Sequence, residues 1–246
     1  MKNILMLMMA GKGTRLGADC PKQYIEIDGI PIFAYILYGY AKTKQIDAFV
    51  LVMQPEWALY VTKWIRRLGL EDQCLVAAGA DERSLSVRNG ILAAEKIAEK
   101  DDVLLIHDAT HPYVDVTGLR EIIRAVHELG AATLAQGEYD TVYRRTSDNL
   151  LRQVLPRQEV VSGASPEAFR FGLIADIFRT EDDESLRRMT SAGAIALACQ
   201  IPMAVVESDV LNLKITYPRD LELMKKLIHT YFFPGIKEEI QERGFE

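Results

Sequence analysis

The sequence is poor in the residues that build disulfides and metal centres. Its 246 residues include only three cysteines, Cys20, Cys74 and Cys199, and four histidines. The cysteines lie far apart and form no CxxC pair, and the histidines show no HExxH spacing, so neither a disulfide framework nor a structural zinc site is expected. This cysteine usage suits a reducing compartment, and we expect a cytoplasmic protein.

Long apolar runs and an excess of positive charge are also missing. No apolar stretch approaches about 18 residues, so we expect no transmembrane helix. The apolar run of residues 4–10 is too short for a secretory signal and leads directly into a glycine-containing segment. The net charge of -6 argues against a broad nucleic-acid or membrane-binding surface, although a local basic pocket for phosphates remains compatible with it.

Short apolar segments alternate with longer amphipathic ones along the whole chain. This pattern predicts an α/β domain of residues 1–246 with a mostly parallel sheet covered by helices on both faces. The chain is long enough to bury a core without cross-links. The expected strands are residues 3–9, 48–53, 73–77, 102–107, 131–136 and 203–207, and the expected helices are residues 32–42, 56–67, 87–98 and 117–129.

The segment from Asp140 to Pro166 breaks this alternation. It is polar, carries four arginines, and places its few apolar pairs between turn residues. Long loops without structure are uncommon in compact domains, so we expect a hairpin arm that projects from the sheet, rather than a solvated loop. An isolated hairpin is only marginally stable, and a second subunit is the obvious partner for it to pack on.

The first segment that carries chemistry runs from Ala10 through Gly11 and Gly13 to Gly17, and Pro21-Lys22 follows. Its small residues allow the backbone to approach a ligand, and successive amide N–H groups can face an anion. Arg15 and Lys22 add positive charge beside those amides, which suits a triphosphate. The spacing matches neither GxGxxG nor GxxxxGK[ST]. A glycine turn with two surface cations is the alternative.

Three later segments follow expected strands or precede an expected helix. The block GADERSLSV, residues 79–87, could read a base or ribose, or could simply start a helix. HDATHP, residues 107–112, ends a strong apolar strand, where ligands of open α/β sheets bind. There Asp108 could hold a metal or a hydroxyl group or cap the strand end. We expect His107 to be structural, whereas His111 is ambiguous.

The last segment, residues 212–221, reads NLKITYPRDL. Lys214 lies between apolar neighbours just before an expected helix start, and a lysine in this setting is more often turned toward a ligand than solvated. Thr216 and Asp220 are plausible caps around Pro218.

In this order, these segments resemble the cytidylyltransferases of the family that includes 2-C-methyl-D-erythritol 4-phosphate and ribitol-5-phosphate cytidylyltransferase. The resemblance covers roughly residues 3–227. It implies a Rossmann-like fold of the nucleotide-diphospho-sugar transferase type. It also implies CTP-dependent, Mg²⁺-requiring transfer of CMP to a phosphorylated polyol, which yields a CDP-polyol and pyrophosphate. The processes implied are isoprenoid or cell-wall polyol biosynthesis, and the implied assembly is a homodimer.

The resemblance assigns roles to residues by position. Arg15, Lys22 and Lys214 match cations that contact the reacting phosphates. The nucleotide-side residues implied are Ala10, Gly11, Gly13, Gly79, Asp81, Ser86 and Asp108. The acceptor-side residues implied are Asp108, His111, Thr141, Arg157 and Ser165, with Asp108 also a candidate metal ligand. Arg157 matches an arginine on the arm that reaches the partner subunit's site. Because this kind of transfer needs little covalent help, positioning and positive charge would do most of the catalysis.

The chain departs from the family pattern only on the acceptor side. The family usually has arginine at His111, glutamine at Glu167 and aspartate at Ser191. A histidine lacks the fixed charge and bidentate fork of arginine, and Glu167 adds negative charge near a bound anion. The Pro55-Glu56-Trp57 turn and the spacing from Thr190 to Asn212 favour the ribitol-phosphate branch, with methylerythritol phosphate as the close alternative.

Two other functions remain open at this point. The chain could be a catalytically weak relative that binds CTP or CDP as a sensor, which would bind CTP without releasing pyrophosphate. It could also be a sugar-1-phosphate nucleotidyltransferase, which shares the glycine loop followed by lysine and would prefer UTP or ATP.

Overall fold

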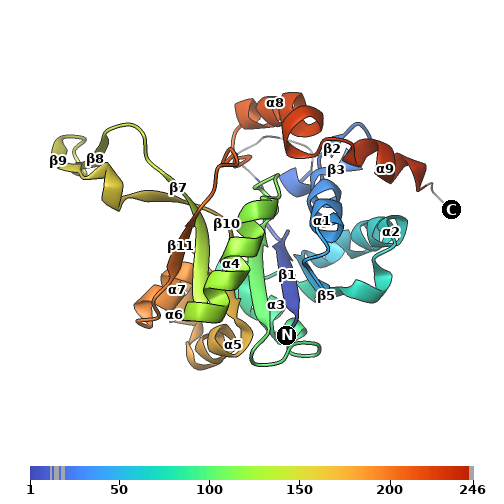
Figure 1. Cartoon of the computed structure of the whole chain (residues 1–246), viewed down its shortest axis with the longest axis horizontal. Coiled ribbons are helices and arrows are strands. Elements are labelled where there is room, and N and C mark those ends of the chain that lie inside the picture. The colour runs from blue at the N-terminus through green and yellow to red at the C-terminus, as the bar shows by residue number, and fades with distance from the viewer. Residues whose placement is uncertain (12, 14–16, 18–19, 244–246) are drawn as a thin grey trace.

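The computed structural model describes residues 1–11, 13, 17 and 20–243. Within these residues, seven strands form one sheet in the order β11-β7-β10-β6-β1-β4-β5 (Figure 1). The pairs β1–β4, β1–β6, β4–β5 and β7–β11 are parallel, and only β10 runs antiparallel to its neighbours. The predicted α/β fold with a mostly parallel sheet is confirmed. The strands are β1 (Asn3–Met8), β4 (Ala48–Met53), β5 (Cys74–Ala78), β6 (Val103–Asp108), β7 (Ala131–Gly137), β10 (Val161–Arg170) and β11 (Ala204–Glu207).

Helices cover both faces of this sheet, because its central strands are apolar on both sides. Along β1, Leu5 and Leu7 face one core, whereas Ile4 and Met6 face the other. The first core is covered by α1 (Ile32–Lys42), α2 (Ala58–Leu68), α4 (Val116–Leu129), α8 (Pro218–Leu227) and α9 (Ile236–Glu242). The second is covered by α3 (Arg83–Ala94), α5 (Phe171–Thr180), α6 (Asp183–Arg187) and α7 (Ala192–Ala198).

Helix α3 lies close to the sheet, and its Gly90 explains why. A Cβ at Gly90 would lie 2.0 Å from Met6 Sδ and 2.8 Å from Val52 Cγ2. Glycine therefore allows the helix to approach β1 and β4 and carries its N-terminal residues to the carboxyl ends of these strands. The helix begins at Arg83, four residues before the predicted start at Val87.

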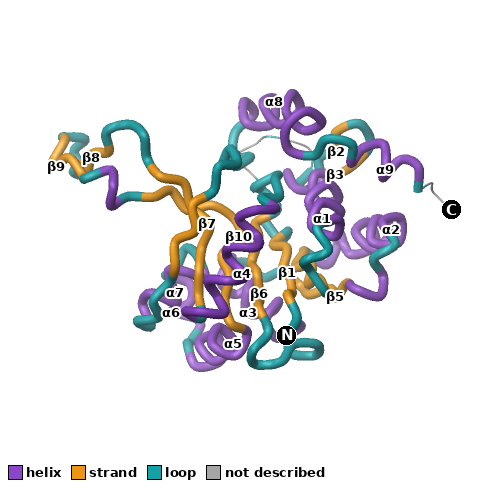
Figure 2. The backbone as a smooth tube through the Cα atoms, viewed as in Figure 1, coloured by secondary structure: helices purple, strands orange, loops and turns teal. Residues whose placement is uncertain are grey.

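The polar segment after β7 contains a hairpin that extends away from the sheet (Figures 1 and 2). Strands β8 (Val142–Arg145) and β9 (Leu151–Leu155) pair with each other. The sequence predicts an arm that continues to Pro166, whereas β10 already begins at Val161 and pairs with β6 and β7. The difference arises because the first half of β10 carries small and polar residues that lack an apolar pattern.

Shorter elements complete the described chain. They are the hairpin strands β2 (Glu26–Ile27) and β3 (Ile30–Pro31), the 3₁₀ helices Lys22–Tyr24, Pro55–Trp57, Glu71–Gln73 and Arg157–Glu159, and the π-helix Ile228–Phe232. Residues 208–217, which include Lys214, form an extended loop rather than a strand and end at the N-terminus of α8. No helix in the described part of the chain is long and apolar enough to cross a bilayer.

Candidate active site

A cavity of about 430 Å³ opens at the carboxyl ends of β1 and β6, beside the N-terminus of α3. In an open α/β sheet this edge is where ligands bind. Segments from five parts of the chain form its walls. The lining residues are Met8, Ala10, Gly11, Gly13, Lys22, Gln23, Gln54, Ala80, Asp81, Glu82, Arg83, Ser86, Asp108, Thr110 and Thr216.

Two glutamine side chains fix the backbone of the glycine segment. Gln23 Nε2 donates to the carbonyls of Met9 and Gly11, at 2.5 and 2.9 Å, and Gln54 Nε2 donates to the carbonyl of Ala10 at 3.1 Å. Because these carbonyls are engaged from behind, the small residues of the segment are left to line the cavity. Gln23 is only 2% exposed, so the anchor itself is part of the core.

The opposite wall is the turn that leads into α3. Ser86 Oγ accepts a hydrogen bond from the Ala80 amide at 2.9 Å and lies 3.0 Å from the Glu82 carbonyl, to which it donates. A Cβ at Gly79 would lie 2.3 Å from Ala10 Cβ, so glycine is needed where the turn meets the glycine segment. The turn is thus held in register with the segment across the cavity.

Lys22 connects the cavity to the loop before α8. Its ammonium group donates to the Ile215 carbonyl at 2.6 Å, and the side chain lines the cavity. Arg15, the other cation predicted for this wall, lies outside the described residues. Positive charge therefore enters the site on the short 3₁₀ helix that follows the glycine segment.

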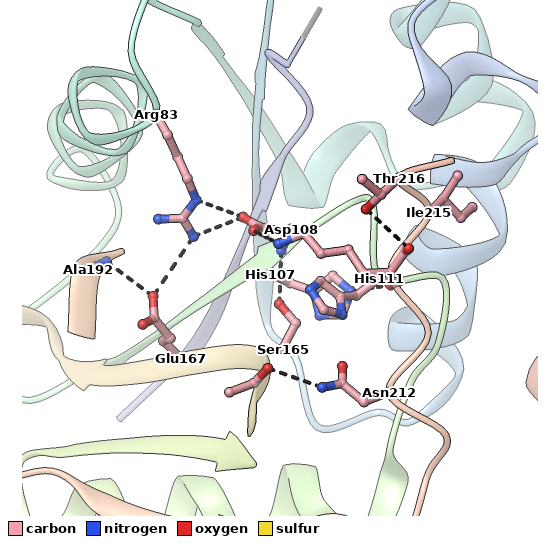
Figure 3. Close-up of polar contacts among 12 residues, drawn as sticks. Arg83, His107, Asp108, His111, Ser165, Glu167, Ala192, Asn212, Ile215 and Thr216 are labelled. Carbon is pink, nitrogen blue, oxygen red and sulfur yellow. Dashed lines mark hydrogen bonds and ion pairs between the residues drawn. The ribbon is translucent and has the colours of Figure 1, made fainter. Parts of the chain in front are cut away.

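Asp108, the last residue of β6, is surrounded by cations (Figure 3). Arg83 Nε and Nη2 lie 3.0 and 2.8 Å from its Oδ1, and Lys214 Nζ lies 3.7 Å from its Oδ2. Burial alone would raise the pKa of Asp108, but Arg83 and Lys214 outweigh burial, and the pKa is lowered. The carboxylate is therefore ionised at neutral pH, with a side chain that is still 19% exposed toward the cavity.

His107 and His111 lie behind Asp108 and are buried as neutral rings. His107 Nε2 faces the His111 carbonyl at 2.8 Å and therefore carries the proton, which leaves Nδ1 to accept from the Tyr40 hydroxyl at 2.9 Å. Burial lowers the pKa of His107 to about 4. Burial, with Lys214 and His107 nearby, lowers that of His111 to about 3. His107 has the structural setting expected of it, and His111 adds no positive charge at neutral pH.

A hydrogen-bond network links the Asp108 backbone to β10 and to the loop before α8. Ser165 Oγ accepts from the Asp108 amide, and the Ser165 amide donates to the Tyr113 hydroxyl, both at 3.1 Å. That hydroxyl donates to Asn212 Oδ1 at 3.0 Å, and Asn212 Nδ2 donates to the Gly163 carbonyl at 3.1 Å. The network holds the candidate acceptor side, including Lys214, against the end of β6.

Glu167 is turned away from the open part of the cavity. Its carboxylate accepts from the amides of Ala192 and Gly193, at 3.2 and 3.0 Å, and lies 3.9 Å from Arg83 Nη2 (Figure 3). Ser191 caps the same helix, α7, by accepting from the Ala194 amide. Both departures from the family pattern therefore serve the N-terminus of α7.

The structure brings most of the predicted site residues together but leaves two apart. Ala10, Gly11, Gly13, Lys22, Asp81, Ser86 and Asp108 line the cavity, while His111, Ser165 and Lys214 adjoin Asp108. Thr141 and Arg157 belong to the arm instead. Arg157 Nη1 donates to the Tyr139 carbonyl at 2.7 Å, and neither residue lines this cavity.

Sequence reasoning missed Arg83 and the two glutamines. Arg83 stands within the GADERSLSV block, yet a charge near a helix start gives no sign of its partner 25 residues away. Gln23 and Gln54 also carry no local signal. Their roles follow only from the fold, which places both side chains against the backbone of the glycine segment.

Three carboxylate residues line the cavity, Asp81, Glu82 and Asp108, and Asp108 Oδ2 lies 3.7 Å from the ammonium group of Lys214. Among the described residues, no group of three or more His, Cys, Asp or Glu side chains is placed to hold a metal. Mg²⁺ is commonly bound through one or two carboxylates together with substrate phosphates and water, rather than by a full protein cage. Asp108 therefore fits a Mg²⁺ ion that arrives with a nucleotide, and does not fit a resident metal centre.

Residues 4–230 match the family model described as IspD, 2-C-methyl-D-erythritol 4-phosphate cytidylyltransferase. The chain is 31% identical over 228 residues to the 2-C-methyl-D-erythritol 4-phosphate cytidylyltransferase of Thermotoga neapolitana, covering 91% of this chain and 95% of that protein. It is 29% identical over 231 residues to the ribitol-5-phosphate cytidylyltransferase of Streptococcus agalactiae, covering 92% and 95%.

Solved structures agree in fold. The crystal structure of 4-diphosphocytidyl-2C-methyl-D-erythritol synthase from Anaerococcus prevotii superimposes with a TM-score of 0.76 at 21% identity, covering 93% of this chain and 96% of that chain. The enzyme from Francisella tularensis gives a TM-score of 0.74 at 23% identity, covering 91% and 99%.

Proposed function

Because the chain belongs to the 2-C-methyl-D-erythritol 4-phosphate cytidylyltransferase family, we propose that it transfers CMP from CTP to a phosphorylated polyol. A phosphate oxygen of the polyol forms a bond to the α-phosphorus of CTP. The bond between that phosphorus and the bridging oxygen to the β-phosphate breaks, and pyrophosphate leaves with the electron pair. The products are a CDP-polyol and pyrophosphate.

The observation that carries the proposal is one cavity lined by six of the seven residues expected on the nucleotide side, together with Lys22. The glycine segment, the turn before α3 and Lys22 meet around about 430 Å³, which lies within the usual range for small-ligand sites. In this proposal, backbone groups near Gly11 and in the Asp81–Ser86 segment bind the cytidine. Gly79 serves the same cavity by allowing the two walls to meet.

Positive charge around the cavity would stabilise the transition state. Lys22 lines the cavity, and Lys214 lies beside Asp108, which lines the same cavity. Charge builds up on the phosphate oxygens as pyrophosphate departs, and fixed cations gain energy there without reorganising. Arg15 completes this set in the proposal.

Mg²⁺ is the cofactor of the proposed reaction. Asp108 would hold it together with the triphosphate oxygens, and the ion would supply neutralisation of phosphate charge. The residues of the chain orient that carboxylate: Arg83 and Lys214 keep it ionised, and Ser165 holds its backbone in place.

On the acceptor side we propose a polyol phosphate, with ribitol 5-phosphate ahead of 2-C-methyl-D-erythritol 4-phosphate. Relatives named for either substrate are about equally similar to the chain, and the turn at Pro55–Trp57 favours the ribitol branch. Asp108, His111 and Ser165 are the acceptor-side groups of one subunit, and His111 replaces a fixed charge by a neutral ring.

We further propose a cytoplasmic homodimer. In it, Thr141 and Arg157 lie on the arm of one subunit and act at the cavity of the other. Both residues lie outside the cavity of their own chain, on a hairpin that projects from the sheet (Figure 1). Apolar side chains on this hairpin, including Tyr143, Leu151 and Val154, are more than half exposed and are suited to packing on a neighbour.

Pyrophosphate release from CTP with a panel of acceptors tests the proposal. We expect release with ribitol 5-phosphate, less with methylerythritol phosphate, and little with either acceptor when UTP or ATP replaces CTP. Binding of CTP without release would favour a nucleotide sensor. Preference for UTP or ATP with a sugar 1-phosphate would favour the other transferase class.

A further inference from the structure

Arg83, the first residue of α3, stands between two carboxylates that come from neighbouring strands (Figure 3). Its Nε and Nη2 contact Asp108 Oδ1 at 3.0 and 2.8 Å, and Nη2 also lies 3.9 Å from Glu167 Oε2. Asp108 ends β6, and Glu167 lies on β10 opposite Ile106 of β6. One guanidinium group is thus paired with the carboxylates of both Asp108 and Glu167.

The far carboxylate is itself fixed. Glu167 accepts from the Ala192 and Gly193 amides, and a Cβ at Gly193 would lie 2.6 Å from Glu167 Oε1. Glycine at this place lets the carboxylate reach the helix backbone. With its side chain only 14% exposed, Glu167 forms a rigid backing for the outer nitrogen of Arg83.

The two carboxylate oxygens of Asp108 face different cations. Both donor nitrogens of Arg83 converge on Oδ1, whereas Oδ2 lies on the side of Lys214, 3.7 Å from its ammonium group. Two donor nitrogens of one planar guanidinium fix the position of Oδ1, which a single ammonium group would do with one donor atom. Oδ2 is therefore held on the side of Lys214.

We propose that Arg83 is a positioning residue for Asp108, which it holds in the orientation that the transfer reaction needs. The proposal rests on the proposed function, in which Asp108 acts at the reacting centre. Arg83 also lines the cavity, so direct contact with the nucleotide phosphates is the competing role. The two roles differ in whether Arg83 acts through Asp108.

A double-mutant cycle separates these roles. We compare wild type, Arg83→Ala, Asp108→Ala and the double variant, and measure kcat and KM separately for CTP and for the acceptor. If Arg83 acts through Asp108, Arg83→Ala changes the same constants as Asp108→Ala and lowers turnover by roughly a hundredfold, the usual effect of a misplaced group. In the Asp108→Ala background, removing Arg83 then changes little further.

Two further variants sharpen the test. Arg83→Lys keeps the charge but cannot place two donors on one oxygen, so we expect it to recover only part of the lost turnover. Arg88→Ala is the matched control, because Arg88 lies on the same helix and pairs with Asp183 away from the cavity. We expect this control to keep wild-type constants.

A readout independent of turnover is the same cycle measured by urea unfolding. The loss of stability on Arg83→Ala should be smaller when Asp108 is already absent, because the contact is then already broken. Additive effects in the kinetic cycle, or a change confined to the KM for CTP, would overturn the inference while the proposed function stands. A wild-type protein that releases no pyrophosphate with any acceptor would overturn both.

Discussion

At the scale of single residues, the site depends on charges that the fold holds at fixed distances from one carboxylate. Arg83 and Lys214 approach different oxygens of Asp108, and Lys22 lines the same cavity and donates to the Ile215 carbonyl. Asp108 and Glu167 offset the charges of Arg83 and Lys214, and Lys22 is a further cation on the cavity wall. Because its pKa is lowered to about 3, His111 is neutral at pH 7 and adds no positive charge to the site.

Replacing Lys22 with alanine should remove phosphate-directed charge without disturbing the core. Contacts of this kind are worth about 2.7–4 kcal/mol in the transition state, so turnover should fall by roughly a hundredfold or more. Steady-state pyrophosphate release measures the loss. Lys225→Ala is the matched control, because Lys225 pairs with Glu222 on the exposed side of α8. Near-normal turnover in Lys22→Ala would remove this residue from the triphosphate site.

The stability of the fold should fall as the pH drops below about 6.5. Burial lowers the pKa of His107 to about 4, so above its ordinary pKa of 6.5 the ring is neutral in both folded and unfolded chains. Below pH 6.5, His107 binds a proton in the unfolded chain but stays neutral in the folded chain. The free energy of unfolding then falls by about 1.4 kcal/mol per pH unit, or about 3 kcal/mol in all by pH 4.

His111 acts in the same direction, because its pKa is lowered to about 3. Urea unfolding at pH 7.5 and 5.5 measures the combined slope, and NMR of the histidine ring protons identifies the groups. We expect both ring signals to stay constant between these pH values while stability declines. Rings that titrate near pH 6.5, or a flat stability profile, would show that these histidines are not held neutral.

The residues that sequence could identify are those with a local signal. The glycine segment and Asp108 stand at strand ends, and Lys22 follows the glycine segment directly after Pro21, so each has a local signal in the sequence. Arg83, Gln23 and Gln54 have no such mark, since their roles depend on which backbone lies opposite them. The sequence predicts Glu167 near a bound anion, whereas its contacts with the α7 backbone follow only from the packing of β10 against α7.

At the scale of elements, the apolar pattern identified the parallel strands because they are buried on both faces. The predicted and observed bounds of β4 coincide at residues 48–53, as do those of α1 at residues 32–42. Strand β10 could not be found in this way. Its residues 162–166 are small, polar or proline, and their position in the sheet is fixed by β6 and β7 rather than by their own pattern.

Helix α3 is the element whose placement most directly shapes the site. Its approach to β1 depends on Gly90, so Gly90→Ala should push the helix away from Met6 and Val52. Overpacking of this kind costs about 1–3 kcal/mol. Urea unfolding measures the cost, and Gly137→Ala is the control because a Cβ there meets nothing within 4 Å. Equal stability of the two variants would show that α3 does not need its close approach.

At the scale of the whole molecule, the cavity of one chain is formed by the sheet edge, whereas its arm lies elsewhere (Figure 1). The exposed apolar residues of the arm have no core of their own to join. A hairpin of two short strands is marginally stable alone, so association with a second copy would both order the arm and deliver Arg157 to a phosphate. Arginine suits this task because its planar fork can grip a phosphate through two hydrogen bonds.

Complementation between two inactive variants tests this arrangement. Lys22→Ala removes a cation from the cavity, and Arg157→Ala removes the arm arginine. If Arg157 acts across the interface, a mixed dimer contains one site in which both residues are intact, and pyrophosphate release returns on mixing. If Arg157 acts within its own chain, every site in the mixed dimer still lacks one of the two residues.

Subunit exchange has to be established for this result to decide the matter, and native mass spectrometry of differently tagged chains measures it. Arg152→Ala is the matched control, because Arg152 lies on the same hairpin and belongs to strand β9. We expect Arg152→Ala to remain active alone. No recovery despite complete exchange would show that the arm does not complete the neighbouring site, and a monomer in solution would show it sooner, since one chain has no neighbour for Arg157 to reach.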